Sequence, residues 1–471
     1  GFFCASVAIQ LRPSEMPDES CWKQLAEIVG REHLSSDPAR LLDGRWQGPP
    51  PKAIARPADA RQAQEILRLA NRERLTVAPA GNLTKQRLGG VPRQIDLLLS
   101  LERLHRITDY QPADLTVAVE AGVRMEDLAA TLRRENQMLP LDAPFGGEAT
   151  VGGVLSTNGS GPRRLAYGTA RDVVLGAHFV TAEGTMAKTG GKVVKNVAGY
   201  DLAKLLIGSL GTLAVLTEVT FKVFPIPPAS ATLAFGFQSA TEALRAAYRI
   251  VHSQFALQAL DLLDRAAGSL LEEPLLSELP YTLMVRAAGP VAVVERTGRE
   301  LPVLFRSENP AEIGRVTDEA EANLWEKIQE LTPSFLRANP GGVVIKATVL
   351  LTRMEDVIAA ASRVASEAGL AAATLARAGT GVVYCYLWPP HQSRDSNGAV
   401  KNERFVRAWE SLFPEIERLG GRAIVEWAPA SVKENVNLWG TLRDDFAVMQ
   451  RLKAQFDPQG ILNPGRFYGG I

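Results

Sequence analysis

The segment from Gly190 to Gly211 constrains the fold of this chain most, and it reads GGKVVKNVAGYDLAKLLIGSLG. Five glycines interrupt a mostly apolar run that carries a few specific polar residues: Lys192, Lys195, Asn196, Tyr200 and Asp201. Glycine has no Cβ, so a glycine-dense backbone can approach a ligand closely. The segment therefore predicts backbone wrapped round a ligand; the alternative is a strand and a turn with solvated lysines.

Length and charge limit the classes of protein to consider. A chain of 471 residues predicts two to three packed units. Lys+Arg and Asp+Glu both number 52, and a formal net charge of zero argues against a nucleic-acid-binding or polybasic membrane surface. The sequence contains no apolar run of the roughly 20 residues that span a bilayer. We expect a cytoplasmic protein that meets a membrane only through a partner.

Cysteine and histidine are too scattered to predict a metal centre. Cys4, Cys21 and Cys385 lie far apart with no CxxC pair, so this chain alone supplies neither a zinc knuckle nor an iron–sulfur cluster. The five histidines form no HxH or HExxH motif. Wide spacing of an odd number of cysteines fits a reducing compartment.

Hydrophobic periodicity divides the first half of the chain. Residues 1–50 are expected to form an N-terminal arm with a short helix near Glu19–Val29. From Ala53 the pattern predicts a small β-α-β-β unit, and from Leu115 an α+β unit that is largely antiparallel. Ile226-Pro227-Pro228 predicts a boundary, so the first domain is expected at 51–228.

Strands and helices alternate again over residues 229–432. The predicted strands are 232–237, 281–286, 343–350 and 381–387, and the predicted helices are 240–252, 291–301, 354–368 and 403–419. Two successive β-α-β halves predict a ferredoxin-like α+β cap with a twofold pseudo-repeat. The last segment, 433–471, is predicted to be helical and then to turn tightly at the Asn-Pro-Gly of ILNPGRF.

Two further glycine-containing loops carry ligand-binding signals. Pro79-Ala80-Gly81-Asn82-Leu83-Thr84-Lys85 follows a predicted strand, and its successive N–H groups can form a nest for phosphate oxygens. The run ATVGGVLSTNGSG (149–161) combines glycines with hydroxyl and amide donors. A plain connecting loop is the alternative for each, although the apolar residues of the second run favour burial.

Together these loops resemble the FAD-binding domain of the vanillyl-alcohol oxidase type, also called the PCMH type. Within that superfamily the chain resembles the FAD-binding subunits of bacterial glycolate oxidase. The resemblance is carried by GPRRLAYGTARDVVLG, GGKVVKNVAGYDLAKLLIGSLGTL and RLKAQFDPQGILNPGRF. It implies a two-subdomain flavin domain, a cap, and a C-terminal segment that returns to the flavin domain.

The resemblance also implies the cofactor and its binding residues. FAD is expected to contact Pro79, Ala80, Gly81, Asn82, Leu83, Thr84, Asp142, Thr150, Gly153, Thr157, Asn158, Gly159, Ser160, Gly161, Val215 and Asn463. The loop at 79–85 has no histidine, and no cysteine lies near the ATVGG run, where covalently flavinylated relatives carry their links. The implied FAD is therefore non-covalent, and no metal is expected because the paired histidines of related D-lactate dehydrogenases are absent.

Charged residues on predicted cap strands are the candidates for chemistry. Oxidation of a 2-hydroxy acid requires a cation for the carboxylate and a base for the hydroxyl proton. Lys346 in VVIKATVL is the first choice for the cation, and Arg286 in LMVRAAG is the second. Glu426 in AIVEWAP is a candidate base, and Lys433 lies where the chain re-enters the flavin domain. A solvated strand position remains the alternative for each.

Three functions remain open from sequence. The leading hypothesis is the flavoprotein subunit of a 2-hydroxy-acid dehydrogenase of the glycolate or D-lactate type, which passes electrons to a partner iron–sulfur subunit. The second is a stand-alone FAD-linked alcohol or hydroxy-acid oxidase. The third is a flavin-binding subunit without catalytic activity, paired with a paralogous flavin subunit.

Overall fold

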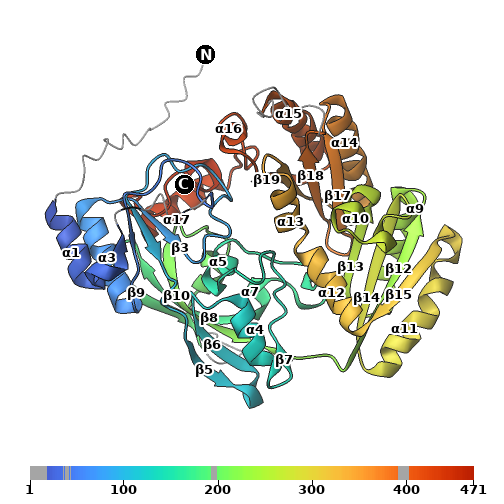
Figure 1. Cartoon of the computed structure of the whole chain (residues 1–471), viewed down its shortest axis with the longest axis horizontal. Helices are drawn as coiled ribbons and strands as arrows, with labels where there is room; N and C mark the ends of the chain where they lie inside the picture. The colour runs from blue at the N-terminus through green and yellow to red at the C-terminus, as the bar shows by residue number, and fades with distance from the viewer. Residues whose placement is uncertain (1–18, 36, 38–41, 43, 192–198, 391–401) are drawn as a thin grey trace.

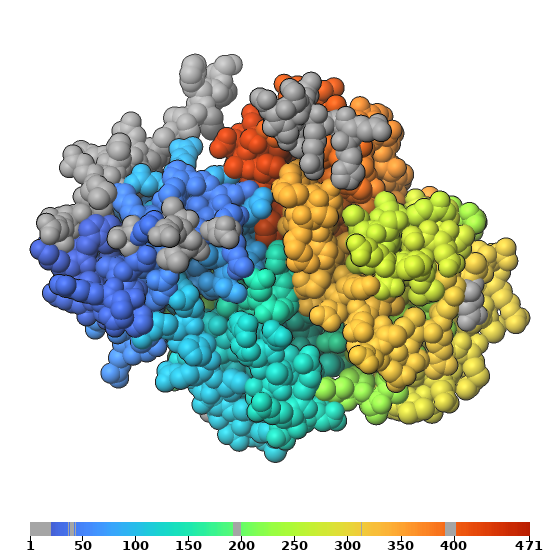
Figure 2. Space-filling view, in the orientation of Figure 1, coloured from blue at the N-terminus to red at the C-terminus, as the bar shows by residue number. Residues whose placement is uncertain are grey.

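The computed structural model describes residues 19–35, 37, 42, 44–191, 199–390 and 402–471. Figure 1 shows an α+β molecule of two lobes, with the N-terminal lobe in blue to green and the cap in yellow-green to orange. We use "cap" for β12 to α16. The red C-terminal segment packs on the N-terminal lobe, and Figure 2 shows the two lobes in direct contact. Within the described residues, no helix is long and apolar enough to cross a membrane.

The first sheet has the order β1-β2-β4-β3, and β2, β4 and β3 run parallel. Its strands are β1 (Leu34–Ser35), β2 (Ala53–Ala55), β3 (Val77–Ala80) and β4 (Leu97–Ser100). Helix α3 (Ala60–Glu73) connects β2 to β3, and Asp59 caps it by accepting from the N–H groups of Arg61 and Gln62 at 2.9 Å. Helix α1 (Glu19–Val29) adds Leu25 to the same core. The β3–β4 loop (residues 81–96) therefore begins at the carboxyl end of a parallel strand, a common place for ligand binding.

The second sheet is antiparallel with the order β5-β6-β10-β8-β9. Its strands are β5 (Ile107–Gln111), β6 (Thr116–Glu120), β8 (Val174–Thr181), β9 (Met186–Gly190) and β10 (Ala214–Lys222). The flanking elements are α4 (Met125–Arg133), β7 (Gln137–Met138), α5 (Val151–Ser156), α6 (Arg164–Tyr167), α7 (Ala170–Val173), α8 (Leu202–Leu206) and β11 (Phe224–Pro225). Helix α5 forms inside the glycine-rich run at 149–161 because Val151, Val154 and Leu155 are buried.

The cap contains one eight-stranded sheet with the order β15-β12-β14-β13-β17-β18-β16-β19. Its strands are β12 (Ala229–Phe237), β13 (Leu257–Asp264), β14 (Tyr281–Gly289), β15 (Ala311–Thr317), β16 (Val343–Thr348), β17 (Ala371–Arg377), β18 (Val382–Trp388) and β19 (Arg422–Trp427). Strands β12–β15 and β16–β19 form two ferredoxin-like halves that join where β13 pairs with β17. The predicted pseudo-repeat is confirmed.

Helices cover both faces of the cap sheet. One face packs against α9 (Ala240–Val251), α11 (Val291–Leu304), α14 (Met354–Glu367) and α15 (Asn402–Arg418). The opposite face packs against α10 (Arg265–Leu270), α12 (Asp318–Gln329) and α13 (Leu331–Ala338). Phe145 of the N-terminal lobe contacts this second face, with its ring 5.5 Å from that of Trp427. The second face therefore meets the N-terminal lobe at Phe145, and Leu165 of that lobe packs against the core of the first face.

The C-terminal segment returns to the N-terminal lobe, as the resemblance implied. Helix α16 (Ala430–Lys433) ends the cap, and the segment that follows it contains α17 (Phe446–Phe456). Beyond α17, Leu462 bridges Val77 in parallel, and the Asn463 N–H donates to the Val77 carbonyl at 2.9 Å. Ile461 and Leu462 are buried in the core of the N-terminal lobe. The last residues thus sit beside β3 and the loop that follows it.

Candidate active site

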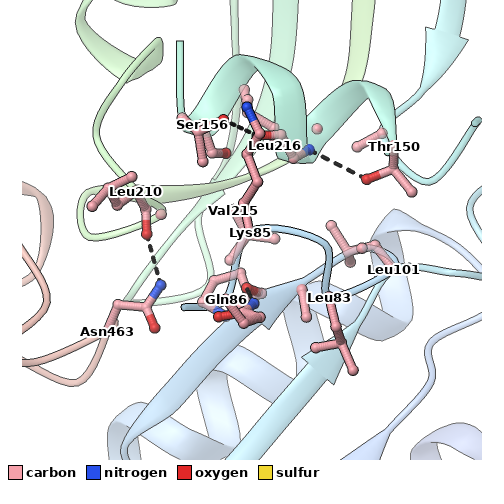
Figure 3. A pocket seen from close by; sticks show the side chains of 18 of the residues that line it. Leu83, Lys85, Gln86, Leu101, Thr150, Ser156, Leu210, Val215, Leu216 and Asn463 are labelled. Atoms are coloured by element: carbon pink, nitrogen blue, oxygen red, sulfur yellow. Dashed lines mark hydrogen bonds between the residues drawn. The ribbon is translucent and has the colours of Figure 1, made fainter. Parts of the chain in front are cut away.

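A cavity with an empty volume of about 660 Å³, open to solvent, lies between the β3–β4 loop, α5, the start of β10 and the C-terminal segment. We call it the first cavity. Figure 3 shows Lys85 and Gln86 on the loop, with Thr150 and Ser156 across the cavity at α5. Parts of the chain that are far apart in sequence build one site here.

The β3–β4 loop presents free amides to the first cavity. Within the described residues, the backbone N–H groups of residues 82–85 donate to no protein acceptor. Leu83 adopts a left-handed conformation with φ of 59°. A Cβ on Gly81 would lie 2.0 Å from Thr150 Oγ1, so glycine is needed there. Such a loop suits a phosphate-type anion.

Two buried basic side chains, Arg466 and Lys433, bind carbonyl groups of the β3–β4 loop. The Arg466 guanidinium donates to the carbonyls of Leu88 at 3.1 Å, Lys85 at 2.8 Å and Gln86 at 2.7 Å. Lys433 Nζ donates to the carbonyls of Arg87 and Gly89, the second at 2.9 Å. Burial lowers the pKa of Arg466 to about 10 and also lowers the pKa of Lys433. Arg466 lies in the ILNPGRF motif but was not predicted from the sequence as a site residue.

Helix α5 and Asn463 complete the first cavity. The Thr150 hydroxyl accepts from the Gly153 N–H at 3.3 Å and caps α5, while the Thr157 hydroxyl donates to the Gly153 carbonyl at 2.8 Å. Asn463 Nδ2 donates to the Leu210 carbonyl at 2.7 Å, as Figure 3 shows. Asn463 Oδ1 is buried without a hydrogen-bond partner in the described part of the chain. Asn463 therefore keeps one acceptor that no described group of the protein uses.

Most of the residues predicted to bind FAD line the first cavity. These are Pro79, Ala80, Gly81, Asn82, Leu83, Thr84, Thr150, Gly153, Thr157, Val215 and Asn463. Asn158, Gly159 and Ser160 line a second, adjoining cavity. Neither lining includes Asp142 or Gly161. Asp142 Oδ2 accepts from the Arg163 N–H at 2.8 Å, and a Cβ on Gly161 would lie 2.0 Å from the Asp142 carbonyl oxygen, so these two shape the neighbouring turn.

The glycine-rich segment at 190–211 contributes fewer residues to the first cavity than its composition suggests. Lys192, Lys195 and Asn196 lie outside the described residues. Tyr200 is 93% exposed, and Asp201 Oδ1 caps α8 by accepting from the Lys204 N–H at 3.3 Å. Gly211, at the end of the segment, does line the first cavity.

The second cavity lies between the N-terminal lobe and the cap and has an empty volume of about 330 Å³. The N-terminal lobe contributes Lys85, Leu88, Pro144, Phe145, Asn158, Gly159 and Ser160. The cap contributes Thr332, Lys346, Tyr384, Glu426 and Trp427. Lys346 and Glu426, two residues predicted from separate strands, therefore line the same small cavity. Lys85 lines both cavities.

Opposite charges shift the pKa values around the second cavity. Tyr384, whose ring centroid lies 5.7 Å from Lys346 Nζ, and Glu426 raise the pKa of Lys346. Burial lowers the pKa of Lys85 to about 8, against the opposing effect of Glu426. Lys346 therefore keeps its positive charge to higher pH than Lys85 does.

The other two candidate residues lie outside the second cavity. Arg286 is buried on β14 and pairs with Glu321 of α12 at 3.2 Å, although its Nε has no partner among the described residues. Lys433 binds the loop carbonyls described above. Lys346 and Glu426 are thus brought together, whereas Arg286 and Lys433 are not.

A buried ion pair behind the cavity was not anticipated from sequence. Arg377 of β17 pairs with Asp261 of β13, and its guanidinium carbon lies 5.9 Å from the centroid of the Tyr384 ring. Burial raises the pKa of Asp261 to about 6. This pair supports Tyr384, which lines the second cavity, from beneath.

Comparison with known families agrees with this geometry. Residues 51–190 match the model of the FAD binding domain, and residues 226–467 match the C-terminal domain of FAD linked oxidases. The chain belongs to the FAD-linked oxidases. It is an FAD-linked oxidoreductase, and the fold and superfamily expected from sequence are confirmed. The loop amides, Gly81 and the unpaired Asn463 oxygen fit the pyrophosphate-bearing cofactor that this family binds.

Curated relatives match along nearly the whole chain. Glycolate oxidase subunit GlcD of Bacillus subtilis is 27% identical over 95% of this chain and 96% of that protein. D-2-hydroxyglutarate dehydrogenase of Xanthomonas citri is 28% identical over 94% and 93%. D-lactate dehydrogenase of Archaeoglobus fulgidus is 27% identical over 88% and 90%.

Solved structures of low sequence identity share the fold. A p-cresol methylhydroxylase with bound substrate superposes with a TM-score of 0.79 at 14% identity, covering 96% of this chain and 97% of that one. A 4-ethylphenol oxidase from Gulosibacter chungangensis gives a TM-score of 0.73 at 15% identity, covering 96% and 98%. These matches show the fold alone.

Proposed function

We propose that this protein oxidises a small 2-hydroxy acid of the glycolate or D-lactate type, with non-covalent FAD as cofactor. One observation carries the proposal: Lys346 and Glu426 line a cavity of about 330 Å³ that adjoins the cofactor cavity. The names of the matched relatives support a hydroxy acid as substrate. No histidine or cysteine is among the residues that line the first cavity, which supports non-covalent binding.

The side chains of the second cavity supply what the reaction needs from the protein. When bound, FAD supplies the hydride acceptor. Lys346 binds the substrate carboxylate, and Glu426 accepts the hydroxyl proton. Phe145 and Trp427, whose tilted rings meet at the lobe interface, exclude water, which strengthens both polar interactions. The residues proposed to bind FAD are those that line the first cavity, with Asn158, Gly159 and Ser160 at its junction with the second.

We further propose that electrons leave through a partner iron–sulfur subunit. No group of three or more potential metal ligands occurs among the described residues. One relative is itself named a subunit. Cys385 is a free, buried thiol, which supports a cytoplasmic location. We also propose domain limits at 228/229 and 432/433, where the chain enters and leaves the cap.

Anaerobic flavin reduction tests the proposal. The purified FAD-loaded protein is mixed with glycolate, D-lactate or D-2-hydroxyglutarate, and the flavin absorbance near 450 nm (roughly, a general property of oxidised flavins) is followed. We expect one of the first two acids to bleach the flavin and Lys346→Ala to raise the KM while FAD stays bound. Peroxide on admission of air would instead indicate an oxidase. Absence of reduction by any acid, alone and with partner subunits, would refute the proposal.

A further inference from the structure

Lys85 occupies the junction between the two cavities. It is the last residue of the predicted phosphate-binding motif, and it lines both cavities. A Cβ added to Gly159 would lie 2.7 Å from Lys85 Nζ, so the ammonium reaches past α5 to the second cavity. No feature of the proposed function has yet used this side chain.

Neither Lys85 nor Glu426 has an ionic partner within the described residues. Lys85 Nζ makes no hydrogen bond or salt bridge there, and the Glu426 carboxylate likewise has none. A partly buried ammonium without a hydrogen-bonded partner is costly, because burial removes solvation that the charge of Glu426 replaces only in part. An anionic ligand in the second cavity would supply the missing partner.

We propose that Lys85 is a substrate-binding residue, and that the substrate carboxylate is held between Lys85 of the N-terminal lobe and Lys346 of the cap. This inference rests on the proposed function. Each lysine donates to the carboxylate, leaving Glu426 free to accept the hydroxyl proton. The two lysines and Glu426 carry a net charge that one carboxylate neutralises. The substrate thereby links the two lobes across their interface.

The backbone and the side chain of Lys85 have separate roles, so the side chain can be replaced without loss of the backbone contact. Arg466 binds the Lys85 carbonyl, and substitution of the side chain leaves that contact intact. Lys85→Met therefore removes the ammonium while the loop remains anchored. Lys188→Met, at an exposed position on β9, is the matched control.

The test measures binding of carboxylates that cannot be oxidised. Acetate and 2-hydroxy-2-methylpropanoate, which lacks a Cα–H, are titrated against the FAD-loaded protein, and the Kd is read from the change in flavin absorbance. Since a charge-assisted hydrogen bond is involved, we expect Lys85→Met to raise both Kd values about 10- to 100-fold with FAD content unchanged. Lys188→Met should leave them at the wild-type value. An unchanged Kd in Lys85→Met overturns the inference.

Two further measurements keep the inference falsifiable if Lys85→Met fails to hold FAD. Gly159→Ala places a methyl group against the ammonium and should raise the Kd. In the wild type, the Kd should rise between pH 7 and 9.5 as Lys85 loses its proton near pH 8, whereas Lys346 stays charged. Glu426 and Tyr384 also line this site, and the charges of Glu330 and Arg164 act on Lys85 and Lys346 respectively. A Kd independent of both changes overturns the inference.

The outcomes separate this inference from the proposed function. If wild-type flavin is reduced by a hydroxy acid and Lys85→Met binds carboxylates normally, only the role of Lys85 is wrong. If carboxylates bind in a Lys85-dependent way but no hydroxy acid reduces the flavin, the site is correct and the proposed reaction is wrong.

Discussion

Replacing Arg466 by methionine should weaken FAD binding by about 100-fold or more. The guanidinium donates to three loop carbonyls, those of Lys85, Gln86 and Leu88, at 2.7–3.1 Å. Methionine fills much of the same volume but donates nothing. Each buried carbonyl left without a donor costs about 1–3 kcal/mol. Three such groups give a penalty of at least ~3 kcal/mol.

We expect this penalty to raise the Kd of FAD rather than to lower the free energy of unfolding of the apoprotein. In the apoprotein variant the β3–β4 loop can move until its carbonyls meet water. FAD binding must then restore the loop, and the binding free energy bears that cost. At 1.4 kcal/mol per tenfold change in Kd, ~3 kcal/mol corresponds to roughly 100-fold.

Titration of apoprotein with FAD, followed by quenching of flavin fluorescence, measures this Kd directly. Arg451→Met, at an exposed position of α17, is the matched control and should bind FAD as the wild type does. Arg466→Lys keeps the charge but not the forked geometry, so its Kd should be intermediate. If Arg466→Met binds FAD within about threefold of the wild type, the reasoning from unsatisfied carbonyls is wrong.

Three other predictions follow from named contacts. Gly81→Ala should lower the FAD content, and it should lower the free energy of unfolding by about 1–3 kcal/mol, because the new Cβ meets the Thr150 hydroxyl that caps α5. FAD titration and urea denaturation measure the two effects. Gly147→Ala is the control and should behave as the wild type, because its Cβ would have no neighbour closer than 3.8 Å. Arg377→Met should destabilise the protein by about 3–5 kcal/mol by leaving Asp261 buried and unpaired. Because Asp261 then binds a proton more readily, that loss should be smaller at pH 5 than at pH 8. Cys385, whose thiol pKa burial raises to about 12, should resist iodoacetamide in the native state at pH 8, and rapid alkylation would contradict its placement.

The glycine-containing loops could be predicted from sequence because their chemistry is local. Pro79–Lys85 and the run at 149–161 signal close backbone approach through their own composition. The short helix α5 within the second run was not predicted, since glycine is a poor helix former and only burial of its apolar residues stabilises it.

Several cap strands could not be recognised from local pattern. The strands β13, β15 and β17 were missed, and the sequences LQALDLLD and AAATLAR of β13 and β17 are rich in residues that favour helices. Their strand conformation comes from pairing in the middle of the sheet, where β13 meets β17. Sheet pairing, a long-range interaction, overrides local propensity here.

A second limit of prediction from sequence was the environment of a charged strand residue, that is, which helix or lobe covers its side of the sheet. Lys346 was the first choice and Arg286 the second, but each interrupts an apolar strand with one cation, so both carried the same ambiguity about the face they occupy. Both lie on the face that meets α12 and α13, but Arg286 pairs with Glu321 of α12, whereas Lys346 reaches the lobe interface. The difference depends on which helix covers which strand, and single-sequence periodicity does not contain that information.

The contacts between residues farthest apart in sequence explain why the C-terminal segment returns to the N-terminal lobe. Arg466 and Lys433, which follow the cap strands in sequence, both donate to carbonyls of the β3–β4 loop. The same loop carries the Lys85 side chain toward Lys346 of the cap. The cap is therefore connected to the β3–β4 loop in two ways. One is the C-terminal segment, through Lys433 and Arg466, and the other is the second cavity, which Lys85 lines. The proposed cofactor and substrate sites thus share one loop, which is held by a residue more than 340 positions away.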